Sequence, residues 1–307
     1  MADVSMPPVS QNPAVRSSRF WMPFGDLVLQ ADATQFKINR DILARQSEVF
    51  RDMFSVAVPG AEGDTQVEGC PLVAVSDKVA DWENLLELLY NPILLMKPPS
   101  IQLVAAMLRL GYKYEMTQFK ADALSRLHHE FPTTLQAWDG VAEEMTKMAD
   151  EANSILYLLL LAYELGIHTS IPALAFQTLN TMTLQEIFSD TLPLNDSFPT
   201  YIVVPTNIKH ALALASERLH RHRRDAFSWL DDEDVLPTDD CEQWTVCRRA
   251  AQSLLIDILS EQEHDLRYRF LRPWGGYLAA VGPLFRKSWD ALPSFFDLPK
   301  WDELRDE

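Results

Sequence analysis

Between residues 26 and 54 the apolar residues follow first the spacing of strands and then that of helices. No other part of the chain of similar length indicates so many secondary-structure elements. The unbroken apolar run at 27–29 is typical of a strand that is covered on both faces. Phe36 and Ile38 alternate with polar neighbours, which is the two-residue period of a half-buried strand. We therefore expect two strands, at 27–29 and 36–38.

Two helices are expected directly after these strands. Ile42 and Leu43 open a short one. Ser47 is a favourable N-cap for the next, and Glu48 places an acidic residue in its first turn, where the helix dipole favours negative charge. Apolar residues follow at the i, i+3, i+4 spacing of a packed helix, namely Phe50, Met53 and Phe54.

Between residues 56 and 130 the pattern predicts a loop, a strand and several helices. The loop, rich in Gly and acidic residues, covers 56–69, and the strand covers 72–75. Helices are expected at 81–90, 101–114 and 116–129, and Ser100 can cap the second. An apolar stripe at i, i+3, i+4, i+7 marks the first of these helices: Trp82, Leu85, Leu86 and Leu89.

From residue 138 onward the pattern is helical. A long helix is expected over 142–165, with Gly166 as its C-cap. Further helices are expected at 171–179, 183–188, 204–224 and 244–259. Residues 268–307 contain several Trp and Pro residues and are expected to pack as irregular structure, whereas residues 1–18 are expected to form a disordered tail.

The segments before residue 130 together resemble a BTB/POZ domain, a protein-interaction fold that usually dimerises. Asp26 to Leu29, Phe36 to Arg40 and Leu43 to Phe54 are similar to the family patterns D-hydrophobic-x-hydrophobic, F-x-hydrophobic-H-(R/K) and L-A-x-x-S-x-x-F-x-x-(M/L)-F. The family order continues in residues 73–77, 82–90 and 109–116. Asn39 departs from the pattern, because the family usually has His there, but Asn keeps a side-chain donor and acceptor.

The C-terminal half carries a second resemblance. Cys241 and Cys247, followed by two Arg residues, and the segment 286–304 are similar to the tail of BTB proteins common in mushroom-forming fungi, in which a helical region of unassigned activity follows the BTB domain. The expected fold class is therefore α+β, with a BTB/POZ fold of short strands and clustered helices followed by a mostly α-helical region. The expected bounds are 1–18 for the tail, 19–135 for the BTB/POZ domain and 136–307 for the helical region.

The charge and composition exclude several classes of partner. A net charge of -17 disfavours binding to nucleic acid or to an anionic membrane, because both would repel the protein. The longest apolar run, 155–163, is too short to cross a bilayer. Cys70, Cys241 and Cys247 have unrelated spacings, so neither a disulfide framework nor a zinc site is expected, and we expect an intracellular protein of the cytoplasm or nucleus.

The sequence offers no motif for catalysis or cofactor binding, so we expect no enzyme activity, no cofactor and no metal. None of the 10 Gly residues falls in a phosphate-binding pattern. The basic cluster 217–224 has two interpretations: a contact for an acidic partner, RNA or the import machinery, or a solvated helix end, which we favour. His220 and His222 are poor metal ligands, because neighbouring Arg residues repel cations, and His128 and His129 are expected to be a surface pair.

The resemblance implies a homodimer interface and a charged pocket. The interface would combine an apolar cluster before the first strand with residues of the first helix: Phe20, Trp21, Met22, Phe24, Ile42, Leu43, Gln46 and Val49. Asp26 and Arg40 would lie in the pocket, which in some members receives partner peptides. The alternative, which we favour, is a structural ion pair that fixes the strand against the helix.

The expected function is that of a non-enzymatic interaction protein, which dimerises with itself and presents its helical region to unidentified protein partners. One alternative is a substrate adaptor that binds a cullin scaffold of a ubiquitin ligase. Adaptors often carry a hydrophobic-x-Glu motif in the loop after the second helix, but here Gly60 precedes Glu62 in that pattern, and the helical half lacks a clear match to the BACK region. The other alternative is an uncharacterised enzyme or nucleic-acid module in the C-terminal half.

Overall fold

The computed structural model describes residues 13–56, 65–141, 145–149, 153–195, 198–228, 245–246, 248–249, 252–253 and 278–307. The chain separates into two compact units, and the boundary lies within helix α5. Unit 1 is formed by residues 1–126 and 145–149, and unit 2 by residues 127–144 and 150–307.

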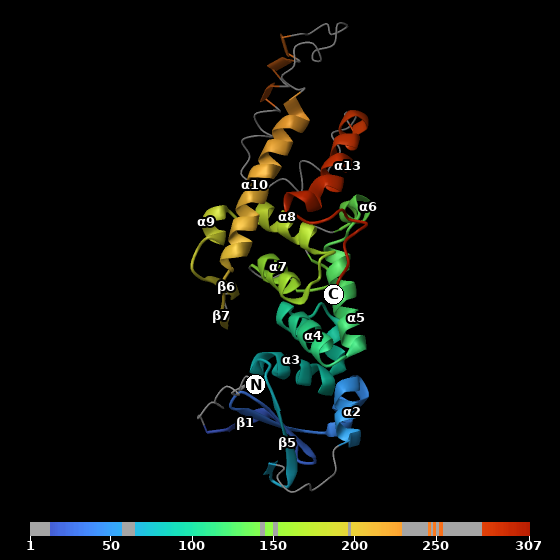
Figure 1. The fold of residues 1–307 in the computed structure, drawn as a ribbon, viewed down its shortest axis with the longest axis vertical. Helices are drawn as coiled ribbons and strands as arrows, with labels where there is room; N and C mark the ends of the chain where they lie inside the picture. Colours follow the sequence, from blue (N-terminus) through green and yellow to red (C-terminus); the bar gives the residue numbers. More distant parts are fainter. Residues whose placement is uncertain are drawn as a thin grey trace, which may run out of the picture. The chain divides into compact units, whose positions relative to one another are not determined.

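Unit 1 contains a five-stranded sheet and a group of helices. Its elements are β1 (Val15–Trp21), β2 (Leu27–Ala31), β3 (Thr34–Ile38), α1 (Arg40–Gln46), α2 (Glu48–Val56), β4 (Gln66–Val67), β5 (Cys70–Val75), α3 (Val79–Tyr90), η1 (Pro92–Met96), α4 (Ile101–Lys113) and the start of α5 (Thr117–Glu130). Within this unit, α3 lies between the sheet and α4 (Figure 1). The predicted strands, and the predicted helices before residue 130, are thereby confirmed to within a few residues.

The strand order is β1-β3-β2-β5-β4, with β2 in the centre. β2 runs antiparallel to β3 and parallel to β5, so Leu29 is flanked by Phe36 on one side and Val73 on the other. Leu27, Val28 and Leu29 are all at most 1% exposed, which confirms a strand covered on both faces. β1 pairs in parallel with β3 and forms an edge of the sheet among the described strands.

An aromatic cluster joins the helices of unit 1. Phe50 of α2 stacks on Tyr114 at a centroid distance of 4.8 Å, and Trp82 of α3 lies 5.4 Å from the same ring. Ser47 holds α2 against this cluster, because its hydroxyl accepts from the Phe50 amide at 3.1 Å and donates to the Tyr114 carbonyl at 2.5 Å. The predicted N-cap at Ser47 therefore also ties α2 to the end of α4.

Asp77 satisfies the polar atoms at the rim of this cluster. Its carboxylate accepts hydrogen bonds from the Tyr114 hydroxyl at 2.5 Å, the Trp82 indole at 3.3 Å and the Lys113 ammonium group at 2.6 Å. Burial, together with the hydrogen bond to Asp77, raises the pKa of Tyr114 well above its ordinary value. The phenol therefore stays protonated and continues to donate far into the alkaline range.

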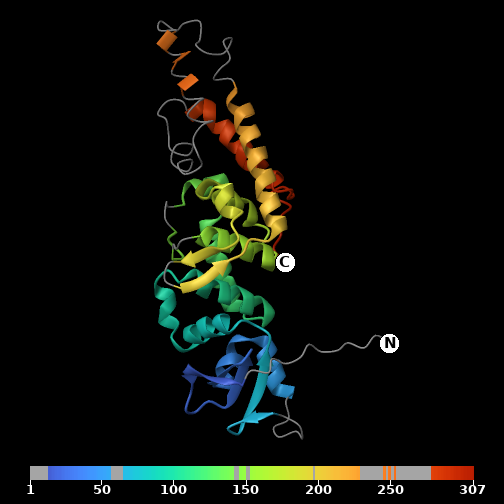
Figure 2. The same ribbon diagram turned by 90° about the vertical axis from the view of Figure 1, so that its left-hand side faces the viewer.

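Unit 2 is mostly helical. Its elements after the end of α5 are α6 (Leu135–Asp139), α7 (Ser154–Leu165), α8 (Ile171–Thr181), α9 (Leu184–Ile187), β6 (Leu192–Asn195), β7 (Phe198–Ile202), α10 (Thr206–Phe227) and α13 (Leu278–Phe295). α7 packs on α8, and α10 lies beside α13, while β6 and β7 form the antiparallel hairpin that Figure 2 shows in yellow. Gly166 ends α7 in the left-handed conformation, as its predicted role as a C-cap requires.

A second aromatic cluster lies in the core of unit 2. Trp289 of α13 packs against Trp138 at a centroid distance of 5.1 Å, and its indole donates to the Thr133 carbonyl at 3.0 Å. Trp301 stacks on Trp289 at 5.4 Å, and Phe176 of α8 contacts Trp138 at 6.2 Å. These rings join α6, α8, α13 and the residues after α13 into one core.

The structure corrects several predictions. Residues 145–149 are not helical, and α7 begins only after Asn153, whose positive φ of 57° is incompatible with a continuous helix from 142. Residues 268–307 are not irregular throughout, because α13 runs through Pro283 and Pro293. The tail does not extend to residue 18, since β1 begins at Val15 and pairs with β3.

Other expectations fall on residues that the structure does not describe. They are the tail over 1–12, the centre of the 56–69 loop, most of the helix at 244–259, and the cysteines Cys241 and Cys247. The β6–β7 hairpin, by contrast, is described but was not predicted.

Tyr114→Phe tests the hydrogen bond to Asp77. The variant keeps the stacked ring but loses the donor, so we expect the free energy of unfolding at pH 8 to fall by about 1–2 kcal/mol. Because the folded state raises the pKa of this phenol, its stabilisation is present below about pH 10 and is lost as the pH rises further. Urea unfolding from pH 8 to 11 should therefore show the two chains converging, and a constant difference would contradict this role.

Candidate protein-interaction surface

The N-terminus of α1 is completed by a residue from another segment. Asp26, just before β2, accepts a hydrogen bond at 2.8 Å from the backbone amide of Arg40, the first residue of the helix. The Arg40 guanidinium Nε lies 3.8 Å from the second carboxylate oxygen. The carboxylate thus serves α1 as an external cap, where the helix dipole favours an anion.

The pair is exposed to solvent. The side chains of Arg40 and Asp26 are 45% and 55% exposed, so the structure brings the two predicted residues together on an open surface. At this exposure the ion pair itself contributes little to stability, and the bond from Asp26 to the helix amide contributes more. The Asp26 carboxylate therefore acts mainly as a cap of α1, and recognition of a partner peptide by the pair stays a prediction.

Asn39 fixes the turn that precedes β2. Its side-chain amide donates to the Phe24 carbonyl at 3.0 Å, and its side-chain oxygen accepts from the Tyr90 hydroxyl at 3.2 Å. The Asn39 backbone amide donates to the same hydroxyl at 3.1 Å. Burial raises the pKa of Tyr90, which keeps the hydroxyl protonated for this bond. Asn39 thus needs both its donor and its acceptor, and it ties the turn to α3.

The turn between β1 and β2 passes very close to β3. A Cβ atom on Gly25 would lie 2.9 Å from the Lys37 side chain and 3.0 Å from the Ile38 amide nitrogen, so a larger residue would push the turn away. The close approach fixes Phe24 in a position where its side chain is 91% exposed. A phenylalanine held this far into solvent by a rigid turn is available for contact with a partner.

The predicted interface residues divide into a surface group and a buried group. Phe20 and Leu43 are only 3% and 0% exposed, and Phe20 packs edge-on against Phe36, so these two belong to the core of unit 1 and would support an interface from beneath. The others reach the surface to different degrees: Phe24 is almost fully exposed, Val49 is 38% exposed, and Trp21, Met22, Ile42 and Gln46 are half-buried. The guanidinium group of Arg16 lies 4.7 Å above the Trp21 ring.

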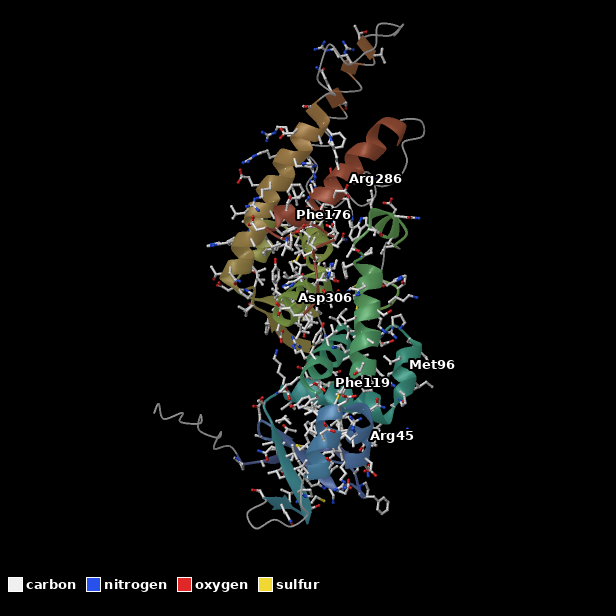
Figure 3. The ribbon with its side chains drawn as sticks, turned by 45° about the vertical axis from the view of Figure 1, so that its right-hand side comes forward. Arg45, Met96, Phe119, Phe176, Arg286 and Asp306 are labelled. Carbon is white, nitrogen blue, oxygen red and sulfur yellow. The ribbon has the colours of Figure 1, made fainter. Side chains whose placement is uncertain are left out.

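Two further apolar segments of unit 1 are exposed and were missed by the sequence analysis. No residue of η1 is buried, and Ile93 and Met96 are 63% and 81% exposed, with Met96 on the outer side of this turn (Figure 3). At the end of α2, Met53 and Val56 are 36% and 79% exposed. For η1, the apolar run 92–96, which lies between two Pro-containing breaks, was the sequence feature that could have predicted an exposed apolar segment.

The basic cluster on α10 makes contacts within unit 2. Arg218 donates to the Phe295 carbonyl at 2.9 Å and to the Asp297 carboxylate at 2.8 Å, and Arg223 donates to the Asn180 side chain at 3.4 Å. Arg221 pairs with Glu217 one turn away on the same helix, while Arg224 is exposed. Two of the four arginines, Arg218 and Arg223, therefore hold α10 against its neighbours.

The two histidines of this cluster are held in the neutral form. Burial, followed by the charges of Arg223 and Arg224, lowers the pKa of His220, and burial lowers that of His222. His222 shares a hydrogen bond of 2.9 Å with Ser288 of α13. Across the described ranges, no three His, Cys, Asp or Glu side chains converge as metal ligands.

Comparison with known proteins identifies unit 1. The family model for the BTB/POZ domain matches residues 19–130, which cover the end of β1, the other strands of the sheet and the helices from α1 to α5. Residues 19–130 are a BTB/POZ domain. A search of the curated proteins finds no match to the chain, and the resemblance of the C-terminal half to fungal BTB proteins gains no support.

The BTB/POZ domain is a general protein-interaction module and is not an enzyme. The predicted fold class is confirmed, since a BTB domain with a small sheet is followed by a helical C-terminal region. In the part of the chain that the structure describes, every helix is too short or too polar to traverse a lipid bilayer.

Substitution of the two charged residues separates the cap from the ion pair. Asp26→Ala removes the acceptor at the start of α1 and should lower the free energy of unfolding by about 1 kcal/mol. Arg40→Ala keeps the backbone amide that donates to Asp26, so it should change the free energy of unfolding by less than about 0.5 kcal/mol. Urea denaturation of both variants provides the comparison, and a larger loss for Arg40→Ala would show that the guanidinium group carries the interaction.

Proposed function

We propose that this BTB/POZ domain, with the bounds 19–135, assembles the chain into a homodimer and that the helical region then presents a surface to other proteins. The observation that carries the proposal is Phe24, which is 91% exposed at the tip of a turn that Asn39 and Gly25 hold in place. Exposing a large aromatic side chain costs free energy that association with a partner would recover.

The surroundings of Phe24 support the same function. Trp21 and Met22 precede it in the same segment, and Ile42 and Val49 on α1 and α2 add further exposed apolar surface. Aromatic and Met side chains are enriched at the centres of protein interfaces. In a two-fold dimer each patch would meet its own copy, so one set of residues serves both partners.

The edge of the sheet offers a second element of such an interface. β1 pairs with β3 through only part of its length, because the register shifts between Arg16 and Trp21. Its outer edge has no neighbouring strand among the described elements, so a strand of another chain could pair there, although the amides of Arg19 and Phe20 already donate to the Ser17 hydroxyl. Pairing of this edge would add directional hydrogen bonds to an apolar contact at Phe24.

The dimer is tested by the solution mass of the full chain. Light scattering over a dilution series should give twice the chain mass of 35.0 kDa, and Phe24→Asp should give the monomer, because it buries a charge at the centre of the contact. Val203→Asp is the matched control, since Val203 is 64% exposed in unit 2 and its substitution should leave the dimer intact.

Either of two results would contradict the proposed dimer. One is a wild-type chain that is monomeric at every concentration, and the other is a Phe24→Asp chain that remains as dimeric as the control. Because Phe24 is almost fully exposed in the single chain, its substitution should leave the thermal melting temperature unchanged and keep the comparison interpretable.

The adaptor function is a second candidate, favoured by the end of α2. Val56 is 79% exposed and Met53 lies one turn before it, directly ahead of the loop through which adaptors of this family contact cullin scaffolds. Glu62 of that loop lies outside the described residues. If the chain is an adaptor, a purified cullin scaffold should co-elute with it, and Val56→Asp should abolish co-elution while Val203→Asp preserves it. Separate elution of the unaltered chain would exclude this function.

A further inference from the structure

The residues that follow α13 return to unit 2 and bind it in the manner of a docked peptide. We define residues 298–307 as the return segment. Its Trp301 ring stacks on Trp289 at 5.4 Å with an interplanar angle of 11°, and the Trp301 indole donates to the Trp289 carbonyl at 2.7 Å. Leu304, one turn further on, is 3% exposed. Both side chains are thus anchored in surfaces made by other parts of the unit.

The third anchor is the carboxylate of Asp306. It accepts from the Thr169 backbone amide at 3.0 Å and from the Thr169 hydroxyl at 2.8 Å, and its second oxygen lies 3.2 Å from Nε2 of His128. Asp306 therefore lies between the end of α5 and the turn that joins α7 to α8 (Figure 3). It is 19% exposed and holds its position through three groups of the unit.

The Asp306 carboxylate lies just before the start of α8, because it accepts from Thr169, the residue that precedes the N-cap position. Ser170 occupies the N-cap position, yet its hydroxyl makes no cap bond, is completely buried and has no hydrogen-bond partner. An anion beside the first turn is favoured by the helix dipole. Asp306 supplies that negative charge from the return segment.

The turn between α7 and α8 also contacts the backbone of the return segment. The Glu307 amide donates to the Gly166 carbonyl at 3.1 Å, and Nδ1 of His168 lies 3.1 Å from the Arg305 carbonyl oxygen. Gly166 has a φ of 66°, which favours Gly, and a Cβ atom there would lie 3.0 Å from the Glu307 side chain, which would have to move slightly. Backbone contacts combined with spaced side-chain anchors are how proteins recognise linear peptides.

We propose that this surface of unit 2 is a docking site for an acidic linear peptide of the pattern aromatic-x-x-Leu-x-Asp, and that the return segment occupies it within the same chain. The docking surface consists of His128, Gly166, His168, Thr169 and Trp289. The pattern follows from the spacing of the three anchors, Trp301, Leu304 and Asp306. A protein partner carrying this pattern would bind by displacing the return segment. The proposal is independent of the dimer, because every residue involved belongs to unit 2.

Tethering explains why such a site would be closed at rest. A segment joined to its own site by a short connection has an effective concentration on the order of millimolar. A separate peptide with the same anchors therefore competes poorly until the tethered copy is detached. Loss of one anchor in the return segment should open the site without altering the docking surface.

The test uses the full chain with Leu304→Asp, which detaches the return segment, and a fluorescently labelled peptide of residues 298–307. Fluorescence anisotropy should show saturable binding to this chain and at least tenfold weaker binding to the wild-type chain, in which the site is occupied. A peptide with Asp306→Ala should bind at least about tenfold more weakly, because it lacks the charged acceptor. Leu214→Asp is the control chain, since Leu214 is 50% exposed on α10, and it should behave as wild type.

Absence of peptide binding to a Leu304→Asp chain that still melts cooperatively would overturn the proposal, and would make the return segment a permanent part of the fold. If that chain does not fold, hydrogen exchange on the wild-type chain decides the question. The unlabelled peptide, at a concentration about tenfold above the millimolar effective concentration of the tethered copy, should accelerate amide exchange in residues 301–307 several-fold, whereas the Asp306→Ala peptide should not. Unchanged exchange with the unaltered peptide would also overturn the proposal.

Discussion

The carboxylate of Asp77 is the interaction on which the rest of the BTB/POZ domain depends. It receives the phenol of Tyr114, the indole of Trp82 and the ammonium group of Lys113, so one acceptor at the end of β5 positions both α3 and α4. Ser47 then joins α2 to the same tyrosine through its carbonyl. With the helices fixed to the sheet in this way, the turn at Phe24 and the start of α1 are held where a partner can reach them.

In both units a carboxylate from a distant segment lies at the start of a helix. In the BTB/POZ domain, Asn39 is the N-cap residue of α1, but its side chain bonds the Phe24 carbonyl and the Tyr90 hydroxyl instead of the helix. Asp26 therefore provides the acceptor at the start of α1. In unit 2, the Ser170 hydroxyl does not cap α8, and Asp306 lies beside its first turn. For α1, local sequence alone would leave the first amide without this acceptor, and the long-range carboxylate makes the stability of the helix start depend on the tertiary fold. For α8, the long-range carboxylate adds a negative charge that the helix dipole favours.

The same dependence explains what the sequence could and could not predict. Ser47 as an N-cap and the buried run at 27–29 follow from local chemistry, so their pattern was sufficient. The burial of Phe20, by contrast, depends on Phe36 across the sheet, and a local pattern cannot distinguish it from exposed Phe24.

The helix α13 was not predicted, because its Pro residues suggested breaks. The burial of Trp289 in a cluster with Trp138 and Trp301 stabilises this helix through distant contacts. The contact between Asp26 and Arg40 was predicted from the family resemblance, whereas its exposure to solvent depends on the tertiary structure and could not be predicted.

Cross-linking between isotopically distinct chains reveals whether chains associate through the BTB/POZ domain. An equal mixture of unlabelled and nitrogen-15-labelled chains is treated with a reagent that joins lysine to carboxyl groups, and mixed-isotope products identify links between chains. If the domain dimerises, these links should concentrate in the segments around Phe24 and α1, which include Lys37, Asp41 and Glu48. Links between chains confined to residues 131–307, or links found only within single chains, would contradict dimerisation through this domain.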